Sequence, residues 1–431
     1  MSYNIVHIAT HLGGGAGSVL MNWVKADKTN MHKILCLNYN YSRVYDRRIV
    51  LVNMRNRAPA VREYIARADI VIVHFWNHPL LFDFLVNMDI PECRLCFWSH
   101  VSGLNAPYVI SEKLVKFSDR FVFSSPISYE AKEIIALPAS QKNKLSHIWT
   151  TGDIAEFSKI KPRPHDGFNI GCIVSLDYSK LHPKFIDFCS KINIPDVTFI
   201  MISDGCDSEK IRQQVEDRGL KSKFIFTGHM EDIKPYLGII DVFGYPLNPN
   251  HFGTCEQVIG EAVAAGIIPV VMKNPAEEFI FLKSLVRFSC ASEEEYVRAI
   301  EMLYENRHKR TSVIDIMQES IVNLYDTGRM VRAWNDMFHK LITMKKRKRV
   351  WTKSYIDHPI SNGARVFIES LGDYGKIFEY GSIEDIKKLF ATNRQWGSRD
   401  KGSPRQYFNT SKTSPMLLRW AILAEEVWNE E

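Results

Sequence analysis

The segment from His251 to Val271 carries the clearest chemistry in this chain of 431 residues. Its pattern predicts a glycine turn at Gly253, a helix with Thr254 as its N-cap, and a buried strand after the helix ends. A Thr followed three residues later by a Gln indicates a capping box, and a Gly before an apolar run indicates a helix end and a strand. The first backbone N–H groups of a helix lack partners within it, and the helix dipole favours negative charge there. We therefore expect an anion site at this helix start.

The expected anion is a diphosphate held by backbone amides around Thr254 and Cys255. Two or three charge-assisted hydrogen bonds suffice, since each contributes about 1.5–3 kcal/mol. Glu261 follows at most two turns later, where a carboxylate accepts both hydroxyls of a ribose. Nucleotide sugars offer both groups. An ordinary βα turn with a solvent-exposed glutamate has the same pattern, so this motif alone leaves both interpretations open.

A second glycine-rich segment lies near the N-terminus. Residues 4–10 predict a strand, residues 11–17 a turn that contains Gly14 and Gly15, and residues 18–25 a helix. This order is that of the phosphate-approach unit of doubly wound folds, although the GxGxxG fingerprint is absent. Glycines allow close approach of a ligand to the backbone or a positive φ, and a plain tight turn is the alternative interpretation.

The elements that position these motifs alternate between strands and helices. Strands are predicted at residues 33–37, 70–74, 94–98, 120–123 and 144–148, and again at 168–174, 197–202, 223–227 and 241–245. Such alternation predicts an α/β fold with two Rossmann-like halves, each a parallel sheet covered by helices. A segment rich in proline and charge at residues 159–167 separates the halves. We expect domains at 1–160 and 168–344, the latter ending in helices from residue 293, and a mainly helical appendage with two helices at 350–431.

Composition restricts the function classes. Hydrophobic residues make up 45% and charged residues 24%, which is typical of a soluble globular protein. No apolar run approaches the roughly 18 residues that span a bilayer, so we expect a cytoplasmic protein. The eight cysteines do not form a disulfide framework, and Cys93 and Cys96 are interpreted as packing residues. No Cys/His set has metal-ligand spacing, so no metal is expected.

One concentrated basic run extends from Lys345 to Arg349. Such a run is typical of a segment that contacts an anionic surface, and here a peripheral contact with the inner membrane face is the expected form. A solvated hinge after a helix is the simpler interpretation. The net charge of +6 is modest, and no nucleic-acid partner is expected.

Together these motifs resemble the retaining glycosyltransferases of the GT-B fold, in particular glycosyltransferase family 4. The resemblance covers roughly residues 1–344 and is strongest between residues 168 and 271. It implies two Rossmann-like domains facing a cleft, with the donor held mainly by the second. The implied activity is of the hexosyltransferase type: a sugar moves from a nucleotide-diphosphate sugar to a hydroxyl of a glycan, lipid-linked or protein acceptor. Retention of configuration, without a metal or another cofactor, is part of the same expectation.

The resemblance also implies roles for residues of the second half. Lys180 occupies the lysine position of the family's phosphate-binding Arg/Lys pair, whereas Ser175 stands where the arginine usually is. Lys184 is the candidate replacement for that missing cation. His229 and Met230 fall in the loop that borders the nucleotide base.

Two acidic residues of the family pattern are only partly matched. Glu261 corresponds to the second acid, the ribose ligand, but the first falls at Asn250 when aligned on the preceding turn. Glu256 is the remaining acid, and it is interpreted either as facing the donor sugar or as complementing the helix N-terminus. On one helix it would lie about 140° around from Glu261.

In the first half, His100 corresponds to the family histidine that touches the donor sugar, and Gly14 and Gly15 correspond to the loop that approaches the phosphates. Two alternatives stay open. One is a nucleotide-sugar epimerase or hydrolase of the same fold. The other is a catalytically silent GT-B partner subunit, which Ser175 and the altered acidic spacing favour.

Overall fold

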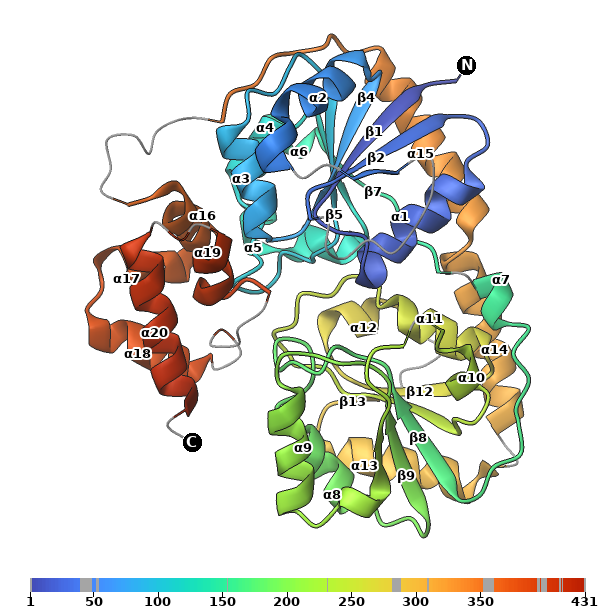
Figure 1. Ribbon diagram of the computed structural model, residues 1–431. Coiled ribbons are helices and arrows are strands. Elements are labelled where there is room, and N and C mark those ends of the chain that lie inside the picture. Colours follow the sequence, from blue (N-terminus) through green and yellow to red (C-terminus); the bar gives the residue numbers. More distant parts are fainter. Residues whose placement is uncertain are drawn as a thin grey trace. The chain divides into compact units, whose positions relative to one another are not determined.

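The computed structural model describes residues 2–38, 49–51, 54–152, 154–230, 232–280, 288–307, 310–351, 360–393, 396, 401–410, 412 and 414–429. Contacts divide the chain into two compact units (Figure 1). The first unit comprises residues 1–150 and 327–431, and the second comprises residues 151–326. Each is built around a parallel sheet, so the predicted α/β fold with two Rossmann-like halves is confirmed.

The first sheet has seven strands in its described part, in the order β3-β2-β1-β4-β5-β6-β7. Their bounds are Asn4–Ala9 (β1), Met31–Cys36 (β2), Ile49–Leu51 (β3), Ile70–Phe75 (β4), Leu95–Ser99 (β5), Arg120–Phe123 (β6) and Leu145–His147 (β7). The helices of residues 1–150 are Gly14–Ala26 (α1), Met54–Arg67 (α2), Pro79–Asn87 (α3), Glu112–Phe117 (α4), Lys132–Ile135 (α5) and Ala139–Lys142 (α6). Strand order reverses between β1 and β4, which makes this pair the switch point of the sheet.

The glycine segment near the N-terminus is helical earlier than predicted. Helix α1 begins at Gly14 instead of residue 18, so Gly14 and Gly15 form its first turn. Gly14 has a φ of +67°, a backbone conformation that residues with a side chain rarely adopt. A Cβ at Gly17 would overlap the carbonyl of Leu12. These glycines therefore let the helix start directly beside the end of β1.

The second sheet has six strands in its described part, in the order β10-β9-β8-β11-β12-β13. Their bounds are Phe168–Cys172 (β8), Val197–Met201 (β9), Phe224–Phe226 (β10), Val242–Tyr245 (β11), Ile268–Met272 (β12) and Ser289–Cys290 (β13). Its helices are Ile154–Phe157 (α7), Phe185–Lys191 (α8), Ser208–Asp217 (α9), Lys234–Leu237 (α10), Gln257–Ala264 (α11), Pro275–Ile280 (α12), Glu293–Glu305 (α13) and Arg310–Leu324 (α14). Here the switch point lies between β8 and β11.

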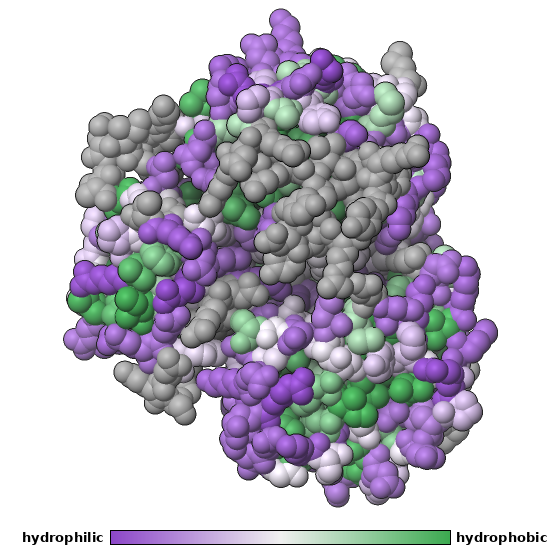
Figure 2. Space-filling view, in the orientation of Figure 1, coloured by the Kyte–Doolittle hydropathy of each residue, from purple (hydrophilic) through white to green (hydrophobic). Residues whose placement is uncertain are grey.

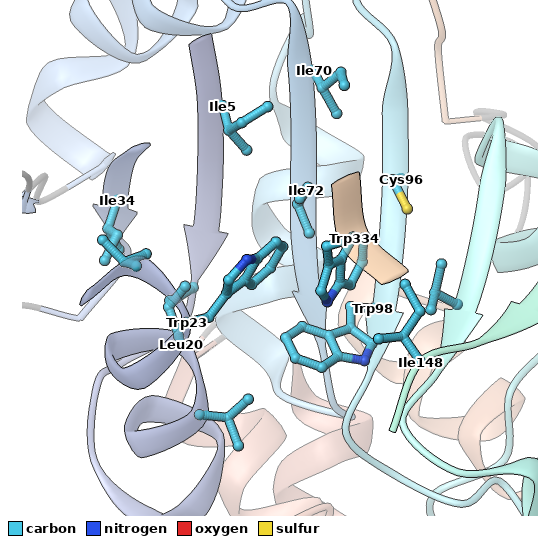
Figure 3. Close-up of a cluster of buried hydrophobic side chains, with 14 of the residues drawn as sticks. Ile5, Leu20, Trp23, Ile34, Ile70, Ile72, Cys96, Trp98, Ile148 and Trp334 are labelled. Carbon is cyan, nitrogen blue, oxygen red and sulfur yellow. The ribbon is translucent and has the colours of Figure 1, made fainter. Parts of the chain in front are cut away.

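The unit boundaries differ from the expected domain boundaries. Helix α15 (Thr327–Ile342) belongs to the first unit, whereas we expected it to end the second domain. Its buried face explains this placement, because Trp334 stacks on Trp23 of α1 with ring centroids 4.5 Å apart. Trp98 of β5 meets both rings edge-on, and Figure 3 shows these indoles against Ile72 and Ile5 of the sheet. The charged segment at residues 159–167 lies within the second unit, where the Arg163 N–H donates to the Gly238 carbonyl at 2.7 Å.

The C-terminal residues also join the first unit. They contain Asn362–Ser370 (α16), Gly375–Tyr380 (α17), Ile383–Thr392 (α18), Pro404–Thr410 (α19) and Pro415–Asn429 (α20), where two helices were expected. Helices α16 and α19 pack on α3. The Tyr108 hydroxyl donates to the Lys401 carbonyl at 2.7 Å, and the Trp396 indole N–H donates to the Ala106 carbonyl at 3.1 Å. These contacts tie the appendage to the loop after β5.

Much of the basic run is occupied within the fold. Arg347 and Arg349 both pair with Asp119, whose side chain is fully buried. Lys348 pairs with Asp89 at 3.1 Å. A buried carboxylate needs such partners because an unpaired buried charge is costly. The run thus has a structural role, and a membrane contact stays a prediction.

The visible face mixes hydrophilic and hydrophobic residues (Figure 2). In the part of the chain that the structure describes, no helix is both long and apolar enough to cross a membrane. The cysteines of the described residues are all free, and Cys93 and Cys96 are buried, as expected of packing residues.

Trp334→Ala tests how much the packing of α15 on the first unit stabilises the fold. Trp334 is fully buried, and truncating such a tryptophan costs about 3–5 kcal/mol of unfolding free energy. We expect that loss in denaturant unfolding followed by circular dichroism. Tyr380→Ala, at a residue 78% exposed, should change the unfolding free energy by less than about 0.5 kcal/mol. Equal effects of the two substitutions would contradict the packing described here.

Candidate functional site

The second unit brings Lys180, Tyr245 and Glu256 together at the carboxyl end of its sheet. Lys180 lies in the loop after β8, Tyr245 ends β11, and Glu256 directly precedes α11. Ligands of open parallel sheets bind at such a switch point, where the two adjacent loops diverge. The three side chains come from segments up to 76 residues apart, so the strand order creates this cluster.

Backbone contacts fix the two loops on each other. Leu181 and Leu247 form an isolated antiparallel bridge. The Asn248 N–H donates to the Lys180 carbonyl at 2.8 Å, and the Asn248 side-chain amide donates to the Tyr178 carbonyl at 2.7 Å. The backbone that carries Lys180 is therefore held in one position.

A buried ion pair joins the loops. Lys180 Nζ lies 2.5 Å from Glu256 Oε1, and the Tyr245 hydroxyl donates to Glu256 Oε2 at 2.7 Å. The side chains of Lys180 and Glu256 are 12% and 5% exposed. Burial alone would raise the pKa of Glu256, but the Lys180 ammonium, His251 and the two hydrogen bonds bring that pKa below its usual value. The site thus holds a charged, oriented ammonium.

The backbone around the ion pair requires unusual conformations. Glu256 has φ 34° and ψ 63°, in the left-handed region. A Cβ at Gly253 would overlap Glu256 Oε1 and lie 2.7 Å from Lys180 Nζ. Glycine at this position therefore makes room for the carboxylate beside the ammonium.

The predicted capping box at Thr254 is wrong. Helix α11 begins at Gln257 with Glu256 as its N-cap, and no side chain caps it. The left-handed turn at Glu256 separates Thr254 from the helix, and the Gln257 side chain donates to the Thr151 carbonyl. Glu256 and Glu261 thus do not share a helix, and the expected 140° relation does not apply.

The other residues predicted for the anion and the ribose lie just before this helix or on it. Thr254 and Cys255 are 7% and 3% exposed. The Cys255 carbonyl accepts a hydrogen bond from the Tyr325 hydroxyl of the segment after α14. Glu261 lies on α11, half-buried, with Oε1 3.8 Å from the position of a Cβ at Gly152.

Sequence reasoning missed the second layer of this site. His251 Nδ1 accepts the Gly253 N–H at 2.9 Å, so its Nε2 donates to Glu277 Oε2, 3.0 Å away. Glu277 is fully buried on α12, and its Oε1 lies 3.4 Å from the Asn274 amide. The sequence did hold a signal for Glu277, because this acidic residue follows closely after the buried strand β12. Strand β12 is parallel to β11, so both strands end at the same edge of the sheet.

The remaining predicted residues of the second unit lie in the loop after β10 and at the start of α8. His229 is exposed and Met230 half-buried in the loop after β10. Lys184 is the exposed N-cap of α8, and after burial its charge is the main influence that lowers the pKa of His182 to about 4. Its proposed role in place of the missing arginine at Ser175 stays a prediction.

Three predicted residues belong to the first unit. Gly14 and Gly15 lie exposed at the start of α1, after β1. His100 follows β5, and burial lowers its pKa to about 3. Its Nε2 lies 3.0 Å from His74 Nδ1. All three lie at the carboxyl edge of the first sheet. Within the described ranges, no three His, Cys, Asp or Glu side chains are placed to hold a metal ion.

Comparison with known proteins shows a family match over part of the chain. Residues 153–319 match the family Glycosyl transferases group 1, so this domain coincides with most of the second unit. The lipopolysaccharide core biosynthesis glycosyltransferase LpsE of Rhizobium meliloti is 24% identical over 144 residues. That alignment covers 33% of this chain and spans 41% of the length of LpsE.

Solved structures share the fold over most of the chain. HepE of Anabaena in complex with UDP-glucose has a TM-score of 0.61 at 16% identity, covering 78% of this chain and all of HepE. Sucrose-phosphate synthase of Thermosynechococcus elongatus has a TM-score of 0.61 at 12% identity, covering 79% of this chain and 99% of that chain. The architecture is therefore the two-domain GT-B fold.

Lys180→Met tests the ion pair. It leaves a buried carboxylate without its cation, which we expect to cost about 3–5 kcal/mol of unfolding free energy. The double variant Lys180→Met/Glu256→Gln should recover at least about 1 kcal/mol, because it removes the unpaired charge. Lys221→Met, at a side chain 78% exposed, serves as the matched control. Additive effects of the two substitutions would show that the charges do not interact.

The lowered pKa of Glu256 predicts that the unfolding free energy depends on pH. Its pKa is lower in the folded protein than its usual 4.5, so its ionisation stabilises the fold above pH 4.5. That contribution is lost as the pH falls through the lowered pKa. The difference in unfolding free energy between the wild type and Glu256→Gln should therefore be constant from pH 7 to 5 and shrink below 4.5. A difference that grows on acidification would contradict this assignment.

Proposed function

We propose that the protein is a glycosyltransferase that binds a nucleotide-diphosphate sugar at the Lys180–Glu256 site. The observation that carries this proposal is the buried, charged Lys180 at the switch point of a domain that matches Glycosyl transferases group 1. An ammonium held in place is suited to a diphosphate, because charge stabilisation is strongest where the donors need not reorganise.

The proposed reaction breaks the bond between the anomeric carbon and the diphosphate oxygen. The electron pair stays on that oxygen, and Lys180 together with the amides around Thr254 and Cys255 stabilises the charge that develops there. The acceptor oxygen bonds to the anomeric carbon, and its proton passes to the leaving phosphate. Transfer on the same face gives retention of configuration, and a metal is not required in this scheme.

Glu256 has two parts in this proposal. Its Oε1 orients the Lys180 ammonium, and its Oε2 is held by Tyr245. A diphosphate would therefore share the Lys180 ammonium with the Glu256 carboxylate. We assign the start of the donor sugar to the space beside this carboxylate. We assign the ribose to Glu261 and the base to the loop of His229 and Met230. At the first sheet we assign ligand contacts to His100, Gly14 and Gly15.

The ligands bound in the similar structures suggest which donors to test first. HepE was solved with UDP and glucose, and starch synthase IV of Arabidopsis thaliana with ADP and acarbose. A mutant of TarM from S. aureus was solved with UDP, α-GlcNAc-glycerol and fondaparinux. UDP- and ADP-sugars are therefore the first donors to test. The proposed acceptor is a glycan, a lipid-linked acceptor or a protein. Membrane contact through Lys345 to Arg349 remains part of the same proposal.

Calorimetric titration with UDP, ADP and GDP tests donor binding. At least one should bind the wild type, and Lys180→Met and Glu261→Gln should each weaken it ten- to a thousandfold, since each contact supplies about 1.4–4 kcal/mol. Lys221→Met should bind as the wild type does. If no nucleotide binds, the chain is a silent GT-B subunit, which Ser175 at the arginine position favours. Conversion of a donor without any acceptor would instead indicate an epimerase or hydrolase.

A further inference from the structure

A chain of buried histidines crosses the first sheet. Asp27 Oδ2 lies 3.1 Å from His32 Nε2, and His32 Nδ1 lies 2.9 Å from His7 Nε2. His7 Nδ1 lies 3.0 Å from His74 Nε2, and His74 Nδ1 lies 3.0 Å from His100 Nε2. We call these five residues the histidine relay. Each inner ring uses both nitrogens in the chain, so the rings cannot choose their protonation independently.

Strand register explains why the rings meet. Each histidine lies two residues beyond the position that pairs with the preceding one, and the register pairs are Ile5 with His32, His7 with Ile72, and His74 with Trp98. A shift of two residues keeps every ring on the same face of a sheet. The relay therefore runs diagonally from the start of β2 to the carboxyl edge after β5. Successive ring centroids are 5.2 Å apart throughout.

Two indole rings pack against the relay. Trp23 contacts the rings of His7 and His32, and Trp98 contacts those of His74 and His100. These indoles belong to the core that Figure 3 shows. Burial lowers the pKa of His7 and His74 well below the usual value, and after burial the other influences are neighbouring relay histidines. The inner rings are therefore neutral.

Asp27 sets the direction of the hydrogen bonds. Besides His32, its carboxylate accepts the Thr29 N–H at 2.9 Å and the Asn30 side-chain amide at 2.8 Å. Burial alone would raise the pKa of Asp27, but these donors lower it below its usual value. An ionised carboxylate only accepts, so His32 Nε2 must donate to it.

We propose that the histidine relay fixes the tautomer of His100 and presents its Nδ1 as a hydrogen-bond acceptor. When the Asp27 carboxylate accepts from His32 Nε2 and each ring carries one proton, every ring has that proton on Nε2 and accepts on Nδ1. The last acceptor is His100 Nδ1, at the edge where ligands of parallel sheets bind. Asp27, His32, His7 and His74 are thus positioning residues for a contact to a ligand hydroxyl.

The relay can also take up one proton without leaving a positive charge on His100. If His100 Nδ1, in place of the leaving phosphate, takes the proton of the acceptor hydroxyl as that oxygen bonds to the anomeric carbon, the Nε2 proton of His100 passes to His74 Nδ1. The same shift follows at His74 and His7. The final N–H bond forms at His32 Nδ1, which leaves an imidazolium beside the Asp27 carboxylate. A serine-type triad pairs one imidazole with a carboxylate by the same logic. This use of His100 rests on the proposed function, whereas the tautomer assignment does not.

Nuclear magnetic resonance of the full chain with ring-15N histidine tests the assignment directly. The chain has 14 histidines, and single His→Gln variants assign the relay signals. We expect the Nε2–H pattern for all four relay rings at neutral pH, with N–N couplings across the three histidine–histidine hydrogen bonds. Absence of these couplings in the wild type would overturn the relay without any variant.

Asp27→Asn gives the sharper outcome. An asparagine whose oxygen keeps the Thr29 N–H turns its amide N–H toward His32 Nε2, which then must accept. Every ring should therefore change to the Nδ1–H tautomer, including His100 at the far end. Asp69→Asn is the matched control, because Asp69 accepts the Asn4 N–H in the same unit outside the relay. A His100 tautomer unchanged by Asp27→Asn would refute the proposal.

Kinetics separates this proposal from the proposed function. Once transfer is measured, Asp27→Asn should lower kcat by about 10²-fold if His100 acts as a base, with a smaller change in the donor KM. Asp69→Asn should leave both unchanged. If no nucleotide sugar is used, the proposed function fails while the tautomer result still stands. If the tautomers do not respond but transfer is seen, the relay fails alone.

Discussion

The ion pair between Lys180 and Glu256 is the contact on which the second unit's site depends. It joins the loops after β8 and β11 where the strand order reverses, and it determines the backbone around it. Gly253 lacks a side chain because the carboxylate occupies that space, and Glu256 adopts a left-handed conformation to reach the ammonium. Helix α11 consequently begins later than its sequence suggests. One electrostatic contact therefore fixes a turn, a helix start and the direction of a cation.

In the first unit, too, buried carboxylates must be paired, and here the carboxylates are those of Asp119 and Asp27. Asp119 is fully buried and is neutralised by Arg347 and Arg349, which return to it from beyond α15. Asp27 is satisfied by backbone and side-chain donors and by His32. Asp119 thus orders a segment distant in sequence and Asp27 orders the turn that follows it, because the cost of leaving a buried carboxylate unpaired exceeds the cost of holding its partners. Residues 327–431 belong to the first unit partly for this reason.

Strands and fold class were predictable from the sequence because buried parallel strands are continuous apolar runs such as Ile268–Met272. The short β3 and β13 carry too few residues to give that signal. Lys180 and Glu256 were identified singly, yet their pairing was not, since it depends on how two loops 76 residues apart meet. His7 and His32 were missed for a similar reason: a histidine within an apolar strand has no visible partner until the register is known.

The departures from the pattern of the family that the sequence resembles have a physical consequence in the proposed site. With Ser175 in place of an arginine, Lys180 is the cation that the ion pair fixes, and Glu256 already offsets its charge. The pair therefore contributes little net attraction to a diphosphate at long range. Short-range terms must supply the rest: hydrogen bonds from the ammonium, which has three donors, and from the amides around Thr254 and Cys255 in the turn before α11. Hydrogen bonds depend strongly on position, so these contacts stabilise a correctly placed phosphate more than one that is only nearby. The arrangement therefore favours one bound geometry of the proposed diphosphate over general electrostatic attraction of anions.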